Sequence, residues 1–126
     1  MTAGRAIELA DAMRDANPFD DRLKKEWLRQ LDALLRAKIA NRCQSQELGE
    51  SGADLLWDEG LDDGAELLAP APYDAIYPQW LCAQMDLALG ETERYSLSYG
   101  VFTQTQQEFA AWARRSFMPG TGRMRT

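Results

Sequence analysis

Apolar residues recur at helical spacing in two segments near the start of the chain, residues 3–16 and 21–42. The first stripe is Ile7, Ala10 and Met13, and the second is Leu23, Trp27, Leu31, Leu34, Leu35 and Ile39. Asn17-Pro18 separates the two segments, because proline disfavours helix at the residue before it. Asp20 precedes the second segment as an N-cap candidate. Asp32–Arg36, an acid–base pair four residues apart, adds only roughly 0.2–0.5 kcal/mol to that helix.

Two further helices are predicted at residues 74–89 and 92–117. The first is apolar around most of its circumference, which is typical of a central helix packed on several sides. Asp74 is its candidate cap and Gly90 its terminating residue. The stripe of the second consists of Tyr95, Tyr99, Phe102, Phe109, Ala113 and Phe117, with Trp112 beside it.

Between the second and third predicted helices, the periodic pattern is lost over residues 44–72. This segment is acidic and rich in glycine. Two short apolar pieces, Leu55-Leu56-Trp57 and Leu67-Leu68-Ala69, flank the turn-like Asp62-Asp63-Gly64, a pattern that allows a short β-hairpin. The expected fold is therefore mainly α: one four-helix bundle-like domain over residues 1–118 with a long acidic loop, followed by a flexible basic tail at 119–126.

Charge is segregated along the 126-residue chain, whose net charge is −6. Residues 1–42 hold nine Lys/Arg and seven Asp/Glu, residues 43–93 hold twelve Asp/Glu and no Lys/Arg, and residues 94–126 hold five Arg and one Glu. A nucleic-acid reader needs a coherent positive face, so this distribution argues against one. It suits partners that meet by charge complementarity. The sequence contains no apolar run long enough to span a membrane and no signal-peptide pattern.

The residues that usually carry catalysis or bind metal are sparse. The sequence has no histidine, which removes the commonest general base and metal ligand. Cys43 and Cys82 lack metal-site spacing and are expected to be reduced. Calcium-loop registers that start at Asp58 or Glu59 place glycine or leucine at the third position, where an oxygen ligand is required. We therefore expect no enzyme, no metal site and no cofactor.

Aromatic residues are concentrated in the second half of the chain, where residues 73–117 contain nine of the twelve. Most of them are expected to form the core between the last two helices. A pair of helices cannot bury all nine inward, so some, with tyrosine favoured, should face the second helix or a neighbouring subunit.

A series of short motifs also follows in a characteristic order. They are Phe19-Asp20-Asp21, Lys25-Glu26-Trp27-Leu28 and Leu31-Asp32, then the run from Glu66 to Tyr77, and then Ala83-Gln84-Met85-Asp86, Gly90-Glu91, Arg94-Tyr95, Phe102, Phe109, Trp112 and Arg115. Together they resemble a family of small proteins encoded among the head-assembly genes of tailed phages and prophages. The likeness covers residues 7–40 and 66–119. The chain departs from the family at Trp112-Ala113, where an aromatic pair is usual.

This resemblance implies a head–tail connector, or adaptor, subunit: a helical virion protein whose copies, commonly twelve, form a ring below the portal protein. Such a ring extends the DNA channel used for genome ejection and offers a platform to a stopper or tail completion protein. The implied location is the head–tail interface of the virion, after assembly in the host cytoplasm.

Acids in such a channel would let DNA pass without specific binding, whereas lysines would hold its phosphates. We therefore expect the acidic loop to face the lumen or a ring surface, with Asp58, Glu59, Asp62 and Asp63 as the candidate residues. Candidate subunit or portal contacts are Tyr95, Tyr99, Arg114, Arg115, Arg123 and Arg125. Two other functions fit the same sequence: a non-ring accessory or chaperone protein of head assembly, and a host-directed regulator that mimics the charge of DNA. The regulator would need most of its acids on one continuous face.

Overall fold

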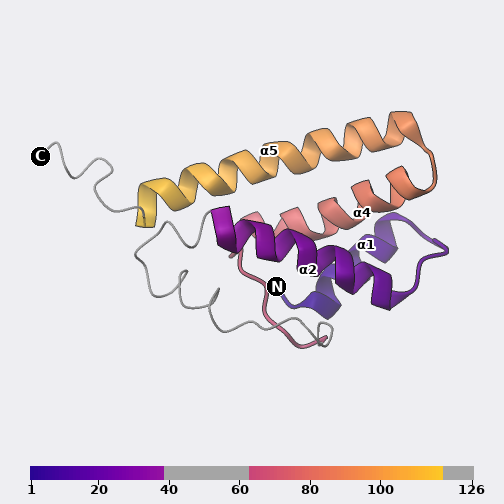
Figure 1. The fold of residues 1–126 in the computed structure, drawn as a ribbon, viewed down its shortest axis with the longest axis horizontal. Coiled ribbons are helices and arrows are strands. Elements are labelled where there is room, and N and C mark those ends of the chain that lie inside the picture. The colour runs from indigo at the N-terminus through magenta and orange to yellow at the C-terminus, as the bar shows by residue number, and fades with distance from the viewer. Residues whose placement is uncertain (39–62, 118–126) are drawn as a thin grey trace, which may run out of the picture.

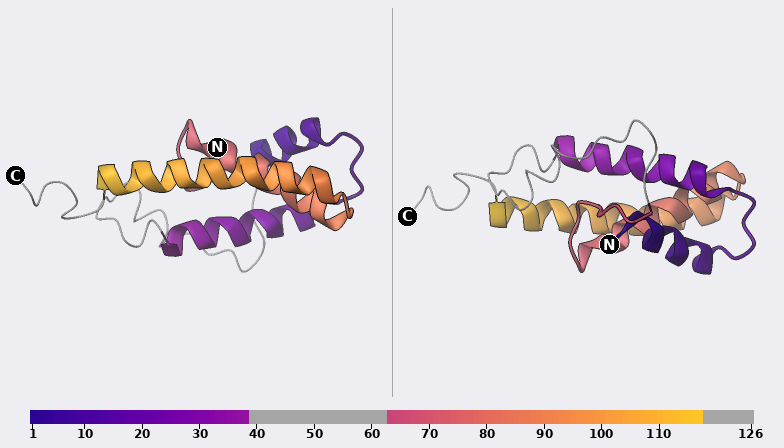
Figure 2. Two further views of the ribbon diagram at one scale, coloured as in Figure 1. Left: turned by 90° about the horizontal axis from the view of Figure 1, so that it is seen from above. Right: turned by 90° about the horizontal axis from the view of Figure 1, so that it is seen from below.

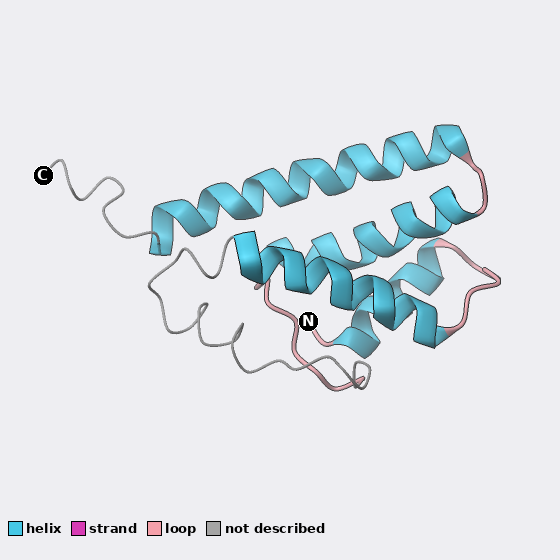
Figure 3. Ribbon diagram, in the orientation of Figure 1, coloured by secondary structure: helices cyan, strands magenta, loops and turns pink. Residues whose placement is uncertain are grey.

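The computed structural model describes residues 1–38 and 63–117, with side chains described as far as Arg115. This part of the chain is mainly helical, as the sequence predicts, and contains four α-helices and one short 3₁₀ turn (Figures 1 and 3). The elements are α1 (Ala3–Met13), α2 (Asp21–Lys38), η2 (Tyr73–Ala75), α4 (Ile76–Ala88) and α5 (Thr92–Phe117). The tail and most of the acidic loop lie outside the described residues.

Helix α1 begins at a side-chain cap, because the Thr2 hydroxyl accepts a hydrogen bond from the Arg5 amide at 3.2 Å. Its buried face is Ala3, Ala6, Ile7 and Ala10, and such small residues let it approach its neighbours closely. The helix ends at Met13, three residues before the predicted end at residue 16. Ala16 has a φ of 57°, in the left-handed region that cannot continue a right-handed helix.

Helix α2 starts as predicted, with the Asp20 carboxylate accepting the Leu23 amide at 3.0 Å. Its buried face, however, is rotated from the predicted stripe. Leu31 and Leu35 are buried, whereas Leu23 and Leu34 are exposed. The other buried positions of α2 are Lys24, Leu28, Asp32 and Arg36. The prediction was wrong at both leucines because the face that turns inward carries charged residues with internal partners, which a hydrophobic pattern does not register.

Helix α4 is preceded by the 3₁₀ turn η2, which contains Asp74. The expectation that Asp74 caps this helix is wrong: Ala75 precedes α4 and no side chain caps it. The expectation of a central helix is confirmed, since α4 contacts α1, α2, η2 and α5. Gly90 ends the α4 segment with a φ of 74°, as predicted, and the turn is closed by the Glu91 amide donating to the Asp86 carbonyl at 3.0 Å.

The described end of the acidic segment runs alongside the start of α1. The Ala3 amide donates to the Ala65 carbonyl at 2.9 Å and the Gly4 amide donates to the Asp63 carbonyl at 2.9 Å. Thr2 and Glu66 form an isolated antiparallel bridge. Residues 63–72 form no strand beyond that bridge, so this part of the predicted β-hairpin is not formed. The rest of the predicted hairpin lies in residues 44–62, outside the described residues.

The helices are arranged around α4. Helix α5 folds back antiparallel along it, and this pair has the most extensive contact between elements of the described chain (Figure 1). Helices α1 and α2 both lie on the side of α4 away from α5, where they contact each other (Figure 1). In the two views of Figure 2 they are seen on either side of α5. One hydrophobic core fills the space between these elements, with Leu28, Ile76, Leu81 and Met85 buried at its centre.

Candidate assembly interface

A buried hydrogen-bond cluster joins the motif of residues 66–77 to α2. The Tyr77 hydroxyl donates to the Asp32 carboxylate at 2.8 Å and accepts the Ala69 amide at 2.7 Å. Asp32 also accepts the Leu68 amide at 3.1 Å and the Arg36 guanidinium at 2.7 Å. Because Asp32, Tyr77 and Ala69 are fully buried, these bonds replace the water that the groups lost on folding. The cluster therefore ties residues 66–69 to two helices.

A second buried carboxylate, Asp86, joins α4 to α1 and α5. Arg14 donates to both of its oxygens, at 2.9 and 2.8 Å, in the bidentate geometry typical of strong carboxylate recognition. The Ser98 hydroxyl donates to the same carboxylate at 2.6 Å, and Arg94 lies 3.8 Å from it. Asp86 of α4 thus links the C-terminal end of α1, through Arg14, and the first two turns of α5, through Ser98 and Arg94, to α4.

Both clusters shift the pKa of a buried group. Burial acts to raise the pKa of the Asp86 carboxyl, but the hydrogen bonds from Arg14 and Ser98 outweigh it and the pKa is lowered. Burial, followed by the nearby charge of Asp32, raises the pKa of the Tyr77 hydroxyl well above its usual range. At neutral pH the carboxylate is therefore charged and the phenol neutral, as the hydrogen bonds require.

Aromatic rings form two groups along α5. Tyr73, Phe109 and Trp112 lie together, with ring centroids 5.4 to 6.0 Å apart. A second run extends from Trp80 through Phe102 and Tyr99 to Tyr95, with centroids 4.9 to 5.6 Å apart. Along that run, burial decreases from Phe102, which is in the core, to Tyr99, which is exposed. Of the two tyrosines predicted as contact residues, Tyr99 is thus exposed and Tyr95 half-buried.

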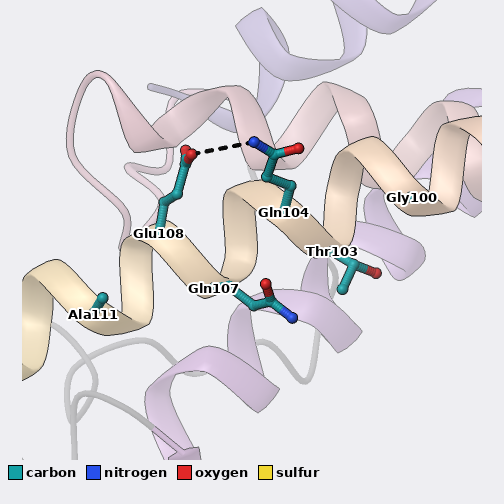
Figure 4. Close-up of a pocket in the computed structure, with 6 residues that line it drawn as sticks. All are labelled: Gly100, Thr103, Gln104, Gln107, Glu108 and Ala111. Atoms are coloured by element: carbon teal, nitrogen blue, oxygen red, sulfur yellow. Dashed lines mark hydrogen bonds between the residues drawn. The ribbon is translucent and has the colours of Figure 1, made fainter.

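Large apolar side chains are exposed on all four described helices. They are Met13 of α1, Leu23 and Leu34 of α2, Leu87 of α4, and Leu97, Tyr99 and Val101 of α5, with Leu89 in the turn between α4 and α5. The face of α5 turned away from α4 is instead polar along Gly100 to Ala111, where it borders an open groove lined by α5 alone (Figure 4). In that view Gln104 and Glu108 point to one side of the helix, and Thr103 and Gln107 to the other. The apolar surface is therefore not spread evenly over α5.

The charged candidates lie apart from one another. Asp63 is on the surface, and its carboxylate lies 2.7 Å from the Lys25 ammonium of α2. Arg114 and Arg115 are exposed near the end of α5. The other predicted residues, Asp58, Glu59, Asp62, Arg123 and Arg125, lie outside the described residues, as does Cys43. Cys82 is a free, buried thiol whose pKa is raised by burial.

Two structural carboxylates were not identified from sequence. Asp32 was interpreted only as half of a helix pair, and Asp86 only as part of a motif. A partial signal existed for both, because Asp32 lies beside Leu28, Leu31 and Leu35, and Asp86 lies beside Cys82, Ala83 and Met85. A carboxylate that is buried among such residues needs a partner.

The described residues contain no group of three or more His, Cys, Asp or Glu side chains placed to hold a metal ion. In the same part of the chain, no helix is both long and apolar enough to cross a membrane. No protein-family model, curated protein or solved structure matches this chain.

Proposed function

We propose that this protein is a head–tail connector subunit of a tailed phage or prophage, with copies arranged as a ring on the portal protein. The observation that carries the proposal is where the motif residues lie in the fold. Those that resemble the connector family are the residues that hold the elements together. Asp20 caps α2, Asp32 and Tyr77 form the central cluster, and Asp86 and Arg94 meet at the α4–α5 turn.

The motif aromatics support the same conclusion. Trp27 of the motif accepts a hydrogen bond at its backbone carbonyl from the indole of Trp80, which lies outside the motif, at 2.9 Å, and this bond links α2 to α4. Phe102 and Phe109 are buried, and Trp112 contacts Phe109 with a centroid separation of 6.0 Å. A chance similarity would be scattered over surface and core alike. Here many of the motif residues lie in the core or in the buried hydrogen-bond clusters, which supports the proposal.

Two surfaces are assigned roles under this proposal. The acidic loop, of which Asp63 is the described end, faces the channel and repels the phosphates of passing DNA. The α5 end with Arg114 and Arg115 contacts the portal or the next structural protein. Both arginines are exposed and basic, as an acidic partner surface would require.

The experiment is reconstitution with the portal protein encoded in the same genome. Native mass measurement should show a complex that carries one ring of this chain, a mass absent when either protein is measured alone. A stable dimer that ignores the portal would contradict the proposal and favour an accessory role in head assembly.

A charge-reversal variant tests the contact assigned to the end of α5. Replacing Arg114→Glu and Arg115→Glu should weaken portal binding at least tenfold. The matched control replaces the exposed Arg5→Glu and Arg22→Glu, which changes the net charge equally but on α1 and α2. Equal loss in both variants would show a non-specific charge effect and contradict the assignment.

A further inference from the structure

Lys24, near the start of α2, is a buried lysine with two polar neighbours from the segment before it. Only 3% of the residue is exposed, and its Nζ donates to Oδ1 of Asp11 at 2.7 Å. Nδ2 of Asn17 donates to the same oxygen at 3.0 Å. Asp11 belongs to α1, whereas Asn17 lies in the loop between α1 and α2. One carboxylate oxygen therefore brings the amine of a lysine beside the side-chain amide of an asparagine.

The Asn17 amide is held at both of its polar atoms. Besides bonding Asp11, Nδ2 donates to the Arg14 carbonyl at 2.9 Å, and Oδ1 accepts the backbone amide of Phe19 at 3.2 Å. The Phe19 N–H polarises the side-chain carbonyl of Asn17 and would stabilise negative charge on its oxygen, as the donors of an oxyanion hole do. Cγ of Asn17 is thus an activated and immobilised electrophile beside an amine.

Asp11 is placed to move protons between the two nitrogens. Its Oδ1 accepts from both, so the carboxylate can act as a general base toward one and as a general acid toward the other. A second carboxylate, that of Asp21, lies 3.8 Å from Nζ of Lys24. Asp11 is 41% exposed and lines an open surface hollow with Asp21, which gives a small product a route to solvent. Nucleophile, base and electrophile therefore meet at one point.

We propose that Lys24 and Asn17 form an isopeptide bond, with Asp11 as the catalytic residue. Asp11 takes a proton from the Lys24 ammonium, and the resulting amine attacks Cγ of Asn17. Asp11 delivers this proton, and a second one taken from the attacking nitrogen, to Nδ2 as the bond between Cγ and Nδ2 breaks. The products are a secondary amide and one ammonium ion, so atoms and charges balance without an oxidant, a metal or a second substrate.

The bond closes residues 17–24 into a covalent ring that fixes the loop after α1 to the first turn of α2. The fold favours the reaction, because groups that are held in contact react at a high effective concentration. The next lysine, Lys25, forms an equally short pair with Asp63, but Asp63 is 72% exposed and no side-chain amide bonds that pair among the described residues. The reaction needs one copy of the chain and no portal, so it goes beyond the proposed connector function and does not depend on it.

Intact-mass spectrometry of the full, folded chain tests the bond. Wild type should be lighter, by one ammonia molecule, than the mass of its amino-acid sequence. Residue 18 is proline and has no N–H, so Asn17 cannot lose ammonia by cyclising onto the following backbone nitrogen. Tryptic digestion should yield peptide 15–22 joined to peptide 23–25, because cleavage after the modified Lys24 is blocked. The joined peptide locates the bond.

Three variants separate the roles of these residues. Lys24→Arg keeps a cation beside Asp11 but removes the amine, and Asp11→Ala removes the base; both should retain the full mass, with circular dichroism showing that they fold. The matched control, Lys25→Arg, should lose ammonia as completely as wild type. A folded wild type at full mass would overturn the proposal, as would equal ammonia loss in Lys24→Arg or Asp11→Ala. Loss of water, with a link between residues 11 and 24, would also overturn it, because Asp11 would then be the electrophile.

Discussion

Removing the Tyr77 hydroxyl should test whether the Asp32 cluster holds the fold together. In Tyr77→Phe the ring remains in place, so the change deletes two hydrogen bonds without creating a large cavity. The bond donated to Asp32 is charge-assisted, and bonds of this kind contribute about 1.5–3 kcal/mol. The second bond satisfies the Ala69 amide, which would be left buried without this acceptor at a cost of about 1–3 kcal/mol.

Because these two terms share one hydroxyl and are not fully additive, we expect a loss of about 3 kcal/mol in the free energy of unfolding. Domains of this size unfold with 5–15 kcal/mol in total, so the loss is large. With a urea m-value near 2 kcal/mol/M, the unfolding midpoint should fall by about 1.5 M. Far-ultraviolet circular dichroism and tryptophan fluorescence should report the same shift.

The control is Tyr99→Phe, which removes the same atom from an exposed tyrosine and should change stability by less than about 0.5 kcal/mol. The pH dependence supplies a second test. The pKa of Tyr77 is raised in the folded state, so its contribution is complete below the unfolded value near 10 and declines as pH rises above it. The difference in the free energy of unfolding between wild type and Tyr77→Phe should therefore become smaller above pH 10. A loss below 1 kcal/mol at pH 7 would refute the assigned role of the cluster.

Three further substitutions follow from the described contacts. Asp86→Asn should cost about 3 kcal/mol at pH 7, because it breaks a buried pair with Arg14. The pKa of Asp86 is lowered on folding, so its contribution is present above pH 4 and lost as pH falls further; acid titration of unfolding should show the two proteins converging there. Gly100→Ala should raise stability by about 0.8 kcal/mol in thermal unfolding, since nothing lies within 4 Å of the added methyl group; a decrease would contradict this. Gly4→Ala should not raise stability, because its methyl group would lie 3.1 Å from the Asp63 carbonyl oxygen. A rise in stability equal to that of Gly100→Ala would show that the backbone at Asp63 moves away without cost.

The mainly helical fold could be predicted from sequence because each helix carries its own period and end signals. The start of α2 at Asp20 and the glycine after α4 are local features, readable from a few neighbouring residues. The rotation of α2 was not predictable in this way. Lys24 is buried because Asp11, thirteen residues earlier, lies 2.7 Å from its ammonium group, and such a partner is identified only once the chain is folded.

The candidate sites were predicted less completely than the fold. Exposure of Tyr99 follows from having more aromatics than two helices can bury, so composition alone indicated it. The contact of Lys24 and Asn17 with one oxygen of Asp11 depends on α1, the loop after it and α2 meeting, and no local pattern encodes that geometry. Leu34 was assigned to the core because both Leu34 and the adjacent Leu35 fit the helical period of apolar residues, although only Leu35 is buried.

The central claim is that copies of this chain form a ring on a portal, and electron cryomicroscopy of the reconstituted portal complex tests it most directly. We predict a density ring coaxial with the portal channel, with one copy of this fold per ring position and residues 58–63 toward the axis. A portal with no added ring, or with single copies bound away from the axis, would contradict the account.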